Sequence, residues 1–146
     1  MRNNQVNAAT AGGIFVKPTV TGSALVTIDN VRLLNNQFGM RIEGGTRATV
    51  VDSVATGNIT NGFIAVGTAV GAAVLNVESS SSSHNGTNGV RADQAGAIIR
   101  ISDTQIKDNL GNGLSINGGG AIVSFGNNSV DGNGVNGSPT STLPQI

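Results

Sequence analysis

The sequence repeats one pattern, in which an asparagine is followed three or four residues later by a glycine that opens an alternating segment. Successive glycines of the pattern are 23, 27, 24 and 24 residues apart, and Gly13 precedes the first of them by 26. The five pairs are Asn36 with Gly39, Asn58 with Gly62, Asn85 with Gly89, Asn109 with Gly113, and Asn133 with Gly137. A recurring interval of this length indicates a repeat architecture in which each repeat is one structural unit.

Each glycine is followed by a short segment in which the first and third positions are apolar. This alternation predicts a β-strand with one buried face. The expected inward residues are Ile14, Val16, Met40, Ile42, Phe63, Ala65, Val90, Ala92, Leu114 and Ile116. The position between them faces outward, and it is occupied in turn by Phe15, Arg41, Ile64, Arg91 and Ser115.

A second alternating segment follows in every repeat, and a weaker third run leads back to the asparagine. The expected inward pairs of the second segment are Val26 with Ile28, Ala48 with Val50, Leu75 with Val77, Ile99 with Ile101, and Val123 with Phe125. The third run includes Leu33, Ala55, Ile106 and Val130. Each repeat is therefore expected to form one coil of two or three short strands.

The predicted fold is all-β, a single-chain parallel β-helix of about five coils. One coil cannot bury its apolar face alone, whereas stacked coils pair every strand with the coils above and below. We expect this solenoid over residues 12–137, a capping tail over 138–146 and a separate segment over 1–11. A β-sandwich would also explain the alternation, but it leaves the recurring coil length and the equivalent Asn and Gly positions unexplained.

Composition narrows the functional classes. The 22 glycines disfavour a helical bundle, and eight basic residues balancing eight acidic ones give no footprint for nucleic acid or anionic membrane. No apolar run is long enough for a membrane helix, and the first residues lack the apolar core of a signal peptide. With no cysteine and a lone histidine, His84, we predict no metal site and no cofactor.

The pattern resembles that of right-handed parallel β-helix proteins of the pectate-lyase-like superfamily. The stretches GGIFVKPTVTGSALVTIDNVRLLNN, ESSSSSHNGTNGVRAD and NGSPTSTLPQI are similar to the C-terminal half of a group of exported bacterial β-helix proteins. The resemblance implies a right-handed coil, which agrees with the handedness of parallel crossovers. It also implies a secreted or cell-surface location and an N-terminal segment that is the remnant of a preceding coil or cap.

The repeated polar positions are expected to be structural. Stacked Asn36, Asn58, Asn85, Asn109 and Asn133 would hydrogen-bond the corner backbone of adjacent coils. The Asn-Gly pairs at Gly62, Gly89 and Gly113 are expected to form left-handed turns, because glycine adopts a positive φ without a steric penalty.

The outward face of the first strand is the best candidate for chemistry. There Arg41 and Glu43 are expected two coils from Arg91 and Asp93, at about 10 Å. Enzymes of the superfamily act on polysaccharides from a comparable face, so the resemblance implies these four as the site residues of an enzyme. The sequence lacks the NTD, DD, HG and RIK signatures of galacturonan hydrolases. The pairs are more simply surface ion pairs, and we assign no catalytic residue.

The sequence therefore favours a non-catalytic structural or interaction module. The alternative is a polysaccharide-binding or polysaccharide-degrading domain that uses Phe15, Arg41, Ile64, Arg91 and Asp93. We also expect a homo-oligomer formed through the N-terminal coil, because an uncovered terminal coil presents an open strand edge. The longer first turns, KPTVTGS and GTAVGA, are the expected contact loops.

Overall fold

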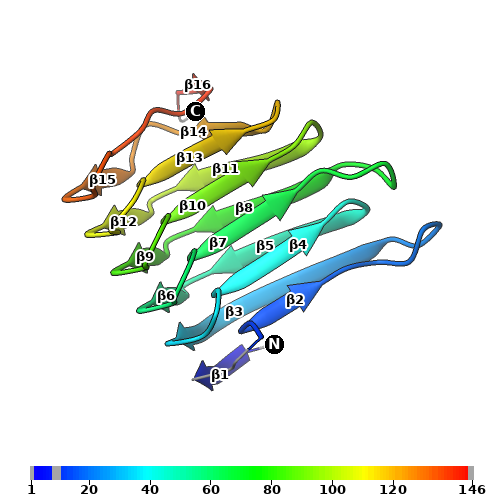
Figure 1. Ribbon diagram of the computed structural model, residues 1–146, viewed down its shortest axis with the longest axis horizontal. Helices are drawn as coiled ribbons and strands as arrows, with labels where there is room; N and C mark the ends of the chain where they lie inside the picture. The colour runs from blue at the N-terminus through cyan, green and yellow to red at the C-terminus, as the bar shows by residue number, and fades with distance from the viewer. Residues whose placement is uncertain (1, 8–10, 145–146) are drawn as a thin grey trace.

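The computed structural model describes residues 2–7 and 11–144, with side chains described from residue 11 onward. The chain winds into a parallel β-solenoid whose coils stack along one axis (Figure 1). The described residues contain 16 strands and no helix. The all-β, right-handed parallel β-helix of about five coils predicted from the sequence is confirmed.

The first side of the solenoid is a five-stranded parallel sheet in the order β13-β10-β7-β4-β2. Its strands are β2 (Ile14–Val16), β4 (Met40–Glu43), β7 (Phe63–Val66), β10 (Val90–Asp93) and β13 (Leu114–Asn117). The register pairs Phe15 with Arg41, Arg41 with Ile64, and Ile64 with Arg91. The outward column expected from the glycine positions is therefore correct.

The second and third sides belong to one continuous sheet, because β3 runs along both of them. The second side contains β3 (Ala24–Leu34), β5 (Thr46–Val51), β8 (Ala73–Glu78), β11 (Ala97–Ser102), β14 (Ala121–Ser124) and β16 (Ser141–Thr142). The third side contains β1 (Arg2–Asn7), β6 (Val54–Thr56), β9 (Ser81–Ser83), β12 (Gln105–Lys107) and β15 (Ser129–Asp131). Strand β1 pairs with the third-side half of β3, from Asp29 to Leu34.

Inward side chains from the three sides fill the space between the sheets, and like positions lie on like. Phe63, the largest fully buried side chain, lies between Met40 and Val90 of the neighbouring coils. Each fully buried aliphatic or aromatic side chain contributes about 1.5 to 3 kcal/mol by leaving water. The core is therefore a set of parallel columns, which fixes the register of the outward residues as firmly as that of the inward ones.

The inward pair expected in the second strand of coil five is wrong by one residue. Ile122 and Ser124 face the core in place of Val123 and Phe125, because Ile99 pairs with Ile122. The alternation of Ala121, Val123 and Phe125 favours the opposite register, because the register that faces the core contains a serine, so here the alternation predicts the wrong parity. The Ser124 hydroxyl oxygen accepts hydrogen bonds from the Gly126 N–H and the Asn128 amide, which makes an inward serine tolerable.

The two sides of coil five also differ in how the chain beyond it covers them. Strand β16 pairs with β14 and adds a further layer to the second side. On the first side the chain beyond coil five forms no strand, and it accepts backbone hydrogen bonds from Gly113 and Leu114 through Val135 and Asn136, among the described residues. Ile116, expected to be buried, is therefore 40% exposed although it points along the inward column.

The left-handed turns lie at positions other than those expected. Gly62, Gly89 and Gly113 do not have a positive φ. The residue directly before each ladder asparagine has one, and these residues are Asn35, Gly57, His84, Asp108 and Gly132. All five are of types that tolerate the left-handed region, by lacking Cβ or by forming local hydrogen bonds.

Steric space explains the glycines that open the first-side strands. A Cβ on Gly89 would lie 2.5 Å from Ile106 Cγ2 and 2.8 Å from Asn109 Nδ2. Gly62 and Gly113 are enclosed in the same way by the neighbouring asparagine and the next coil. Glycine is required here because the ladder asparagine lies against the backbone, and the expected φ argument is wrong.

Candidate functional site

The predicted asparagine ladder is present at the corner between the third and first sides. From Asn58 onward, the side-chain oxygen of each ladder asparagine accepts the backbone N–H of the ladder residue one coil earlier, at 3.0 to 3.1 Å. From the second ladder residue onward, each amide N–H₂ donates to a third-strand carbonyl of the preceding coil. Every step therefore joins adjacent coils through a buried polar group that has its partners. The ladder has a structural role.

Sequence reasoning missed a second ladder, which runs through the asparagines of the Asn-Gly pairs. Asn88 Nδ2 donates to Asn61 Oδ1 at 2.6 Å, and Asn112 Nδ2 donates to Asn88 Oδ1 at 2.9 Å. Both Asn61 and Asn88 are buried. The same spacing that indicated the turns could have revealed this ladder, because these residues recur with the coil.

A third polar column lies at the corner between the second and third sides. The Val31 N–H donates to Ser53 Oγ, and the Ser53 N–H donates to Ser80 Oγ. Further along, the Thr104 N–H donates to Asn128 Oδ1. The residue type changes from coil to coil, so no single-letter repeat marks this corner in the sequence.

The outward face of the first side brings together the residues expected there, and its charges neutralise one another. The carboxylate of Glu43 accepts from Arg41 Nε at 3.1 Å and Nη2 at 2.8 Å. Lys17 Nζ lies 3.3 Å from the same carboxylate. The Arg41 guanidinium also stacks on the Phe15 ring, 5.6 Å from its centroid, and Phe15 meets Phe38 edge to face.

The second charged pair of this face lies two strands further along the solenoid. Arg91 Nη2 donates to Asp93 Oδ2 at 2.9 Å, and Asn117 Nδ2 donates to Asp93 Oδ1 at 2.8 Å. Partial burial opposes ionisation of Asp93, but the hydrogen bond from Asn117 and the nearby arginine charges outweigh it. The pKa of Asp93 is therefore below its ordinary value.

The two pairs do not form a joint site. Ile64 lies between Arg41 and Arg91 in the outward column and is itself buried. Glu43 and Asp93 are thus two strand spacings apart, about 10 Å, with an apolar side chain in the intervening strand. Among the residues that the structure describes, no three His, Cys, Asp or Glu side chains come together as ligands for a metal ion.

A small hollow lies beside this face, between the two long first turns. It has a volume of about 260 Å³ and is lined by Lys17, Pro18, Glu43, Gly44, Thr68, Ala69 and Val70. The turns after β2 and β7 flank the short turn of the coil between them, so residues from three successive coils meet there. Its one acidic group, Glu43, is already paired with Lys17 and Arg41.

A parallel β-solenoid with polar ladders at its corners and an ion-paired outer face defines a β-helix repeat protein. The family model for the right-handed β-helix region matches residues 1–142, so the chain belongs to the right-handed β-helix family. No curated protein and no solved structure matches the chain. In the described part of the chain, no helix is long and apolar enough to cross a membrane.

Proposed function

We propose that the chain is a non-catalytic structural or interaction module of an exported bacterial protein. The family supports the solenoid scaffold, and the similarity of long stretches to exported bacterial β-helix proteins supports the setting. In this role the solenoid presents fixed columns of outward side chains to a partner, and the three polar corner columns keep those columns in register.

One observation carries the non-catalytic part of the proposal: both carboxylates of the first-side face are held by cations. A glycosidase needs one carboxyl group with a raised pKa to protonate the leaving group. The pKa of Asp93 is lowered instead, and Glu43 is held by both Arg41 and Lys17. The Asp93 carboxyl group is therefore not placed to carry a proton at neutral pH.

The alternative is a domain that binds or degrades polysaccharide with this same face. Phe15 is 53% exposed. This exposure favours the alternative, because an aromatic ring can pack against a sugar. However, the Phe15 ring is already in contact with Arg41 and Phe38. The binding form of this alternative is therefore weaker than the structural role, and the degrading form also lacks a free acid.

The test is incubation of the purified chain with polyuronates and neutral polysaccharides, with and without calcium. Reducing ends and unsaturated products are measured over time. We expect no turnover above a heat-denatured sample. Turnover that disappears in Glu43→Ala or Asp93→Ala, but persists in Ser115→Ala on the same face, would establish the enzymatic alternative.

We also propose self-association through coil one. Strand β2 is an edge of the first-side sheet, and Phe15, Val20 and Leu25 of this coil are exposed. Sedimentation velocity over a range of concentrations should show a species heavier than the monomer, which Phe15→Ser weakens. Leu110→Ser removes an even more exposed side chain far from this edge and should have no effect. A monomer at every concentration contradicts the proposal.

A further inference from the structure

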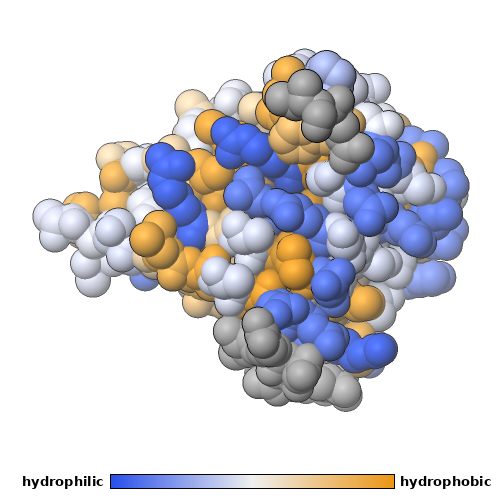
Figure 2. Space-filling model, turned by 180° about the vertical axis from the view of Figure 1, so that it is seen from behind, coloured by the Kyte–Doolittle hydropathy of each residue, from blue (hydrophilic) through white to orange (hydrophobic). Residues whose placement is uncertain are grey.

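A groove on the outer face of the second side is lined by residues that take no part in the ion pairs of the first side. It has a volume of about 320 Å³ and is lined by Leu25, Val26, Thr27, Arg47, Ala48, Thr49, Val74, Asn76 and Arg100. Seen from behind, the molecule carries hydrophilic side chains beside hydrophobic ones and no single apolar patch (Figure 2). The lining of the groove combines two arginines, two threonines and an asparagine with four aliphatic residues, so it is suited to a polar ligand.

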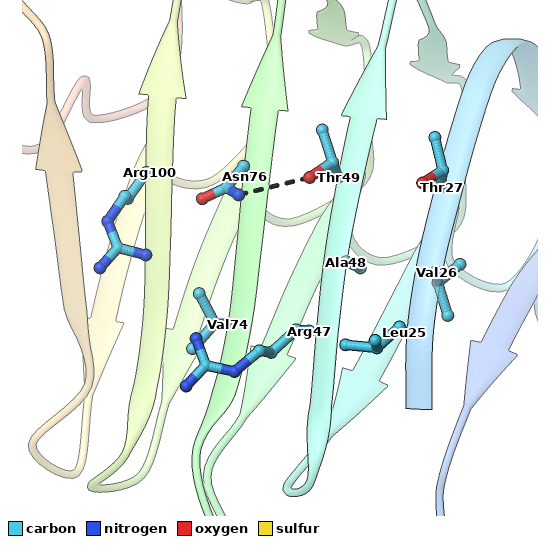
Figure 3. A pocket seen from close by; sticks show the side chains of 9 residues that line it. All are labelled: Leu25, Val26, Thr27, Arg47, Ala48, Thr49, Val74, Asn76 and Arg100. Carbon is cyan, nitrogen blue, oxygen red and sulfur yellow. Dashed lines mark hydrogen bonds between the residues drawn. The ribbon is translucent and has the colours of Figure 1, made fainter. Parts of the chain in front are cut away.

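Two arginines line this groove from the strands on either side of β8. Arg47 on β5 pairs with Val74 on β8, and Arg100 on β11 pairs with Asn76, two residues further along β8. In Figure 3 the Arg47 side chain reaches across to the Val74 side chain, and the Arg100 side chain runs alongside β11 toward the same end of the groove. Val74 faces outward yet is only 6% exposed, as expected where arginine stems cover an apolar residue.

Neither arginine has a counter-ion. No ion pair joins Arg47 or Arg100 to any side chain that the structure describes. Glu78 follows Asn76 by two residues on the same outward face, and it forms an ion pair with neither of the two arginines. Two cations in one groove repel each other, and the repulsion is relieved when an anion lies between them.

The donors of the groove favour a tetrahedral oxyanion. A guanidinium presents five N–H donors in a fixed fork, so two of them match three or four oxygens better than the two of a carboxylate. Thr49 Oγ1 accepts from Asn76 Nδ2 at 3.3 Å, which leaves the Thr49 hydroxyl proton and the second Asn76 N–H for a ligand. No aromatic residue lines the groove, so it offers no stacking surface to nucleic-acid bases.

We propose that this groove binds sulfate-ester groups of a sulfated glycan. The two guanidiniums hold the sulfate, while the Thr49 and Asn76 side chains hydrogen-bond the sugar hydroxyls. The proposal rests on the interaction role given above and supplies it with a ligand class. It involves a different face of the solenoid from the Arg41 and Arg91 pairs.

The test is titration of the full chain with a heparin-derived hexasaccharide, followed by calorimetry and by NMR shifts of the groove amides. We expect Arg47→Gln and Arg100→Gln each to weaken binding about tenfold, the loss of one charge-assisted contact. The double variant should bind no better than background. Arg32→Gln removes the same charge from the third side and should change the affinity less than about twofold.

Matched probes identify the ligand class. The desulfated hexasaccharide should not bind, and inorganic sulfate should compete with the sulfated one. If the double variant bound the hexasaccharide as tightly as the wild type does, the groove would not be the binding site. If the desulfated hexasaccharide bound as tightly as the sulfated one, the ligand would not be an oxyanion. Single-stranded DNA that binds as tightly through the same arginines would overturn the glycan. Turnover of polysaccharide by a folded variant of the groove would refute the non-catalytic role and leave the groove proposal untouched. A failure of the proposed function and a failure of the groove proposal are therefore distinguishable.

Discussion

The two outward faces of the solenoid carry arginines in equivalent settings, but these arginines have different partners. On the first side each arginine has an acid two residues further along its own strand, as in Arg41 with Glu43 and Arg91 with Asp93. On the second side Arg47 and Arg100 have Thr49 and Ser102 at that position. Because side chains two apart share a face of a strand, the i+2 residue decides whether an outward arginine is neutralised or available to a ligand.

Both faces depend on the coil register, so the largest expected effect comes from breaking a corner. Asn85 accepts the Asn58 backbone N–H and donates to Asn109 and to the Ala55 carbonyl. Asn85→Ala leaves these buried groups without partners, at about 1 to 3 kcal/mol each. We expect a loss of at least about 3 kcal/mol in the free energy of unfolding, measured by urea denaturation.

Asn127→Ala is the matched control, because Asn127 is exposed and lies outside the corner ladder. It should change the free energy of unfolding by less than about 0.5 kcal/mol. A similar loss in both variants would mean that the ladder contributes no more than a surface amide. The claim that both outward faces depend on the corner ladder would then be wrong.

The second prediction disturbs the first side and leaves the second in place. Gly89→Ala puts a Cβ against Ile106 and Asn109, which should cost about 1 to 3 kcal/mol. The larger side chain of Gly89→Asn should cost more, because the requirement is steric space. If Gly89→Asn were the better tolerated variant, a left-handed backbone would be the reason for the glycine. Urea denaturation decides between them, and Ser115→Ala on the same side is the control.

The fold was predictable from the sequence because the coil repeats its chemistry. The same Asn and Gly types return at each corner, and the alternation of the first-side strands is unambiguous. In coil five the alternation of Val123 with Phe125 predicts the wrong register, and the stacking of Ile122 on Ile99 decides. Exposure of Ile116 depends on what lies beyond coil five, which no local pattern encodes.

The candidate sites were less predictable. The first-side pairs were visible because Arg and acid alternate within one strand. The groove was not, since Arg47 and Arg100 are 53 residues apart and come to line one groove only because β5 and β11 both pair with β8. Placing them together requires the register of three coils, including the long first turn of coil three.

The third prediction exchanges the properties of the two faces. Glu43→Gln frees Arg41 and Lys17 from their shared carboxylate, so the first side should gain affinity for the sulfated hexasaccharide by about threefold. Stability should fall by about 1 to 3 kcal/mol, because the Glu43 carboxylate is buried and binds both cations. Thr49→Glu makes the reverse change by giving Arg47 a carboxylate two residues away, and it should weaken groove binding about tenfold.

Thr49→Gln is the matched control for the reverse change, because it adds a side chain of similar size without charge. It should weaken binding by less than Thr49→Glu does. Equal affinities for the two Thr49 variants would show that bulk, and not neutralisation of Arg47, controls the groove. The rule drawn from the i+2 position would then fail on the second side.

The smallest expected effect is the pH dependence of the first-side pair. The pKa of Asp93 is lowered from its ordinary value of 3.8, so the folded state binds this proton less readily than the unfolded chain. The ion pair therefore stabilises the fold fully above the unfolded pKa, and the contribution is lost as the pH falls through the folded pKa. The free-energy difference between wild type and Asp93→Asn should be constant above about pH 5, at no more than about 1 kcal/mol, and shrink below about pH 4.

Arg91→Gln should remove part of this dependence, because Arg91 supplies one of the charges that lower the pKa. The Asp93 carboxyl carbon shift, followed by NMR, reports the same titration directly. A midpoint above the ordinary value would reverse the sign of the pH dependence, with stability gained as the carboxyl group becomes protonated. It would also give Asp93 the raised pKa that a general acid needs, and the observation that carries the non-catalytic role would be lost.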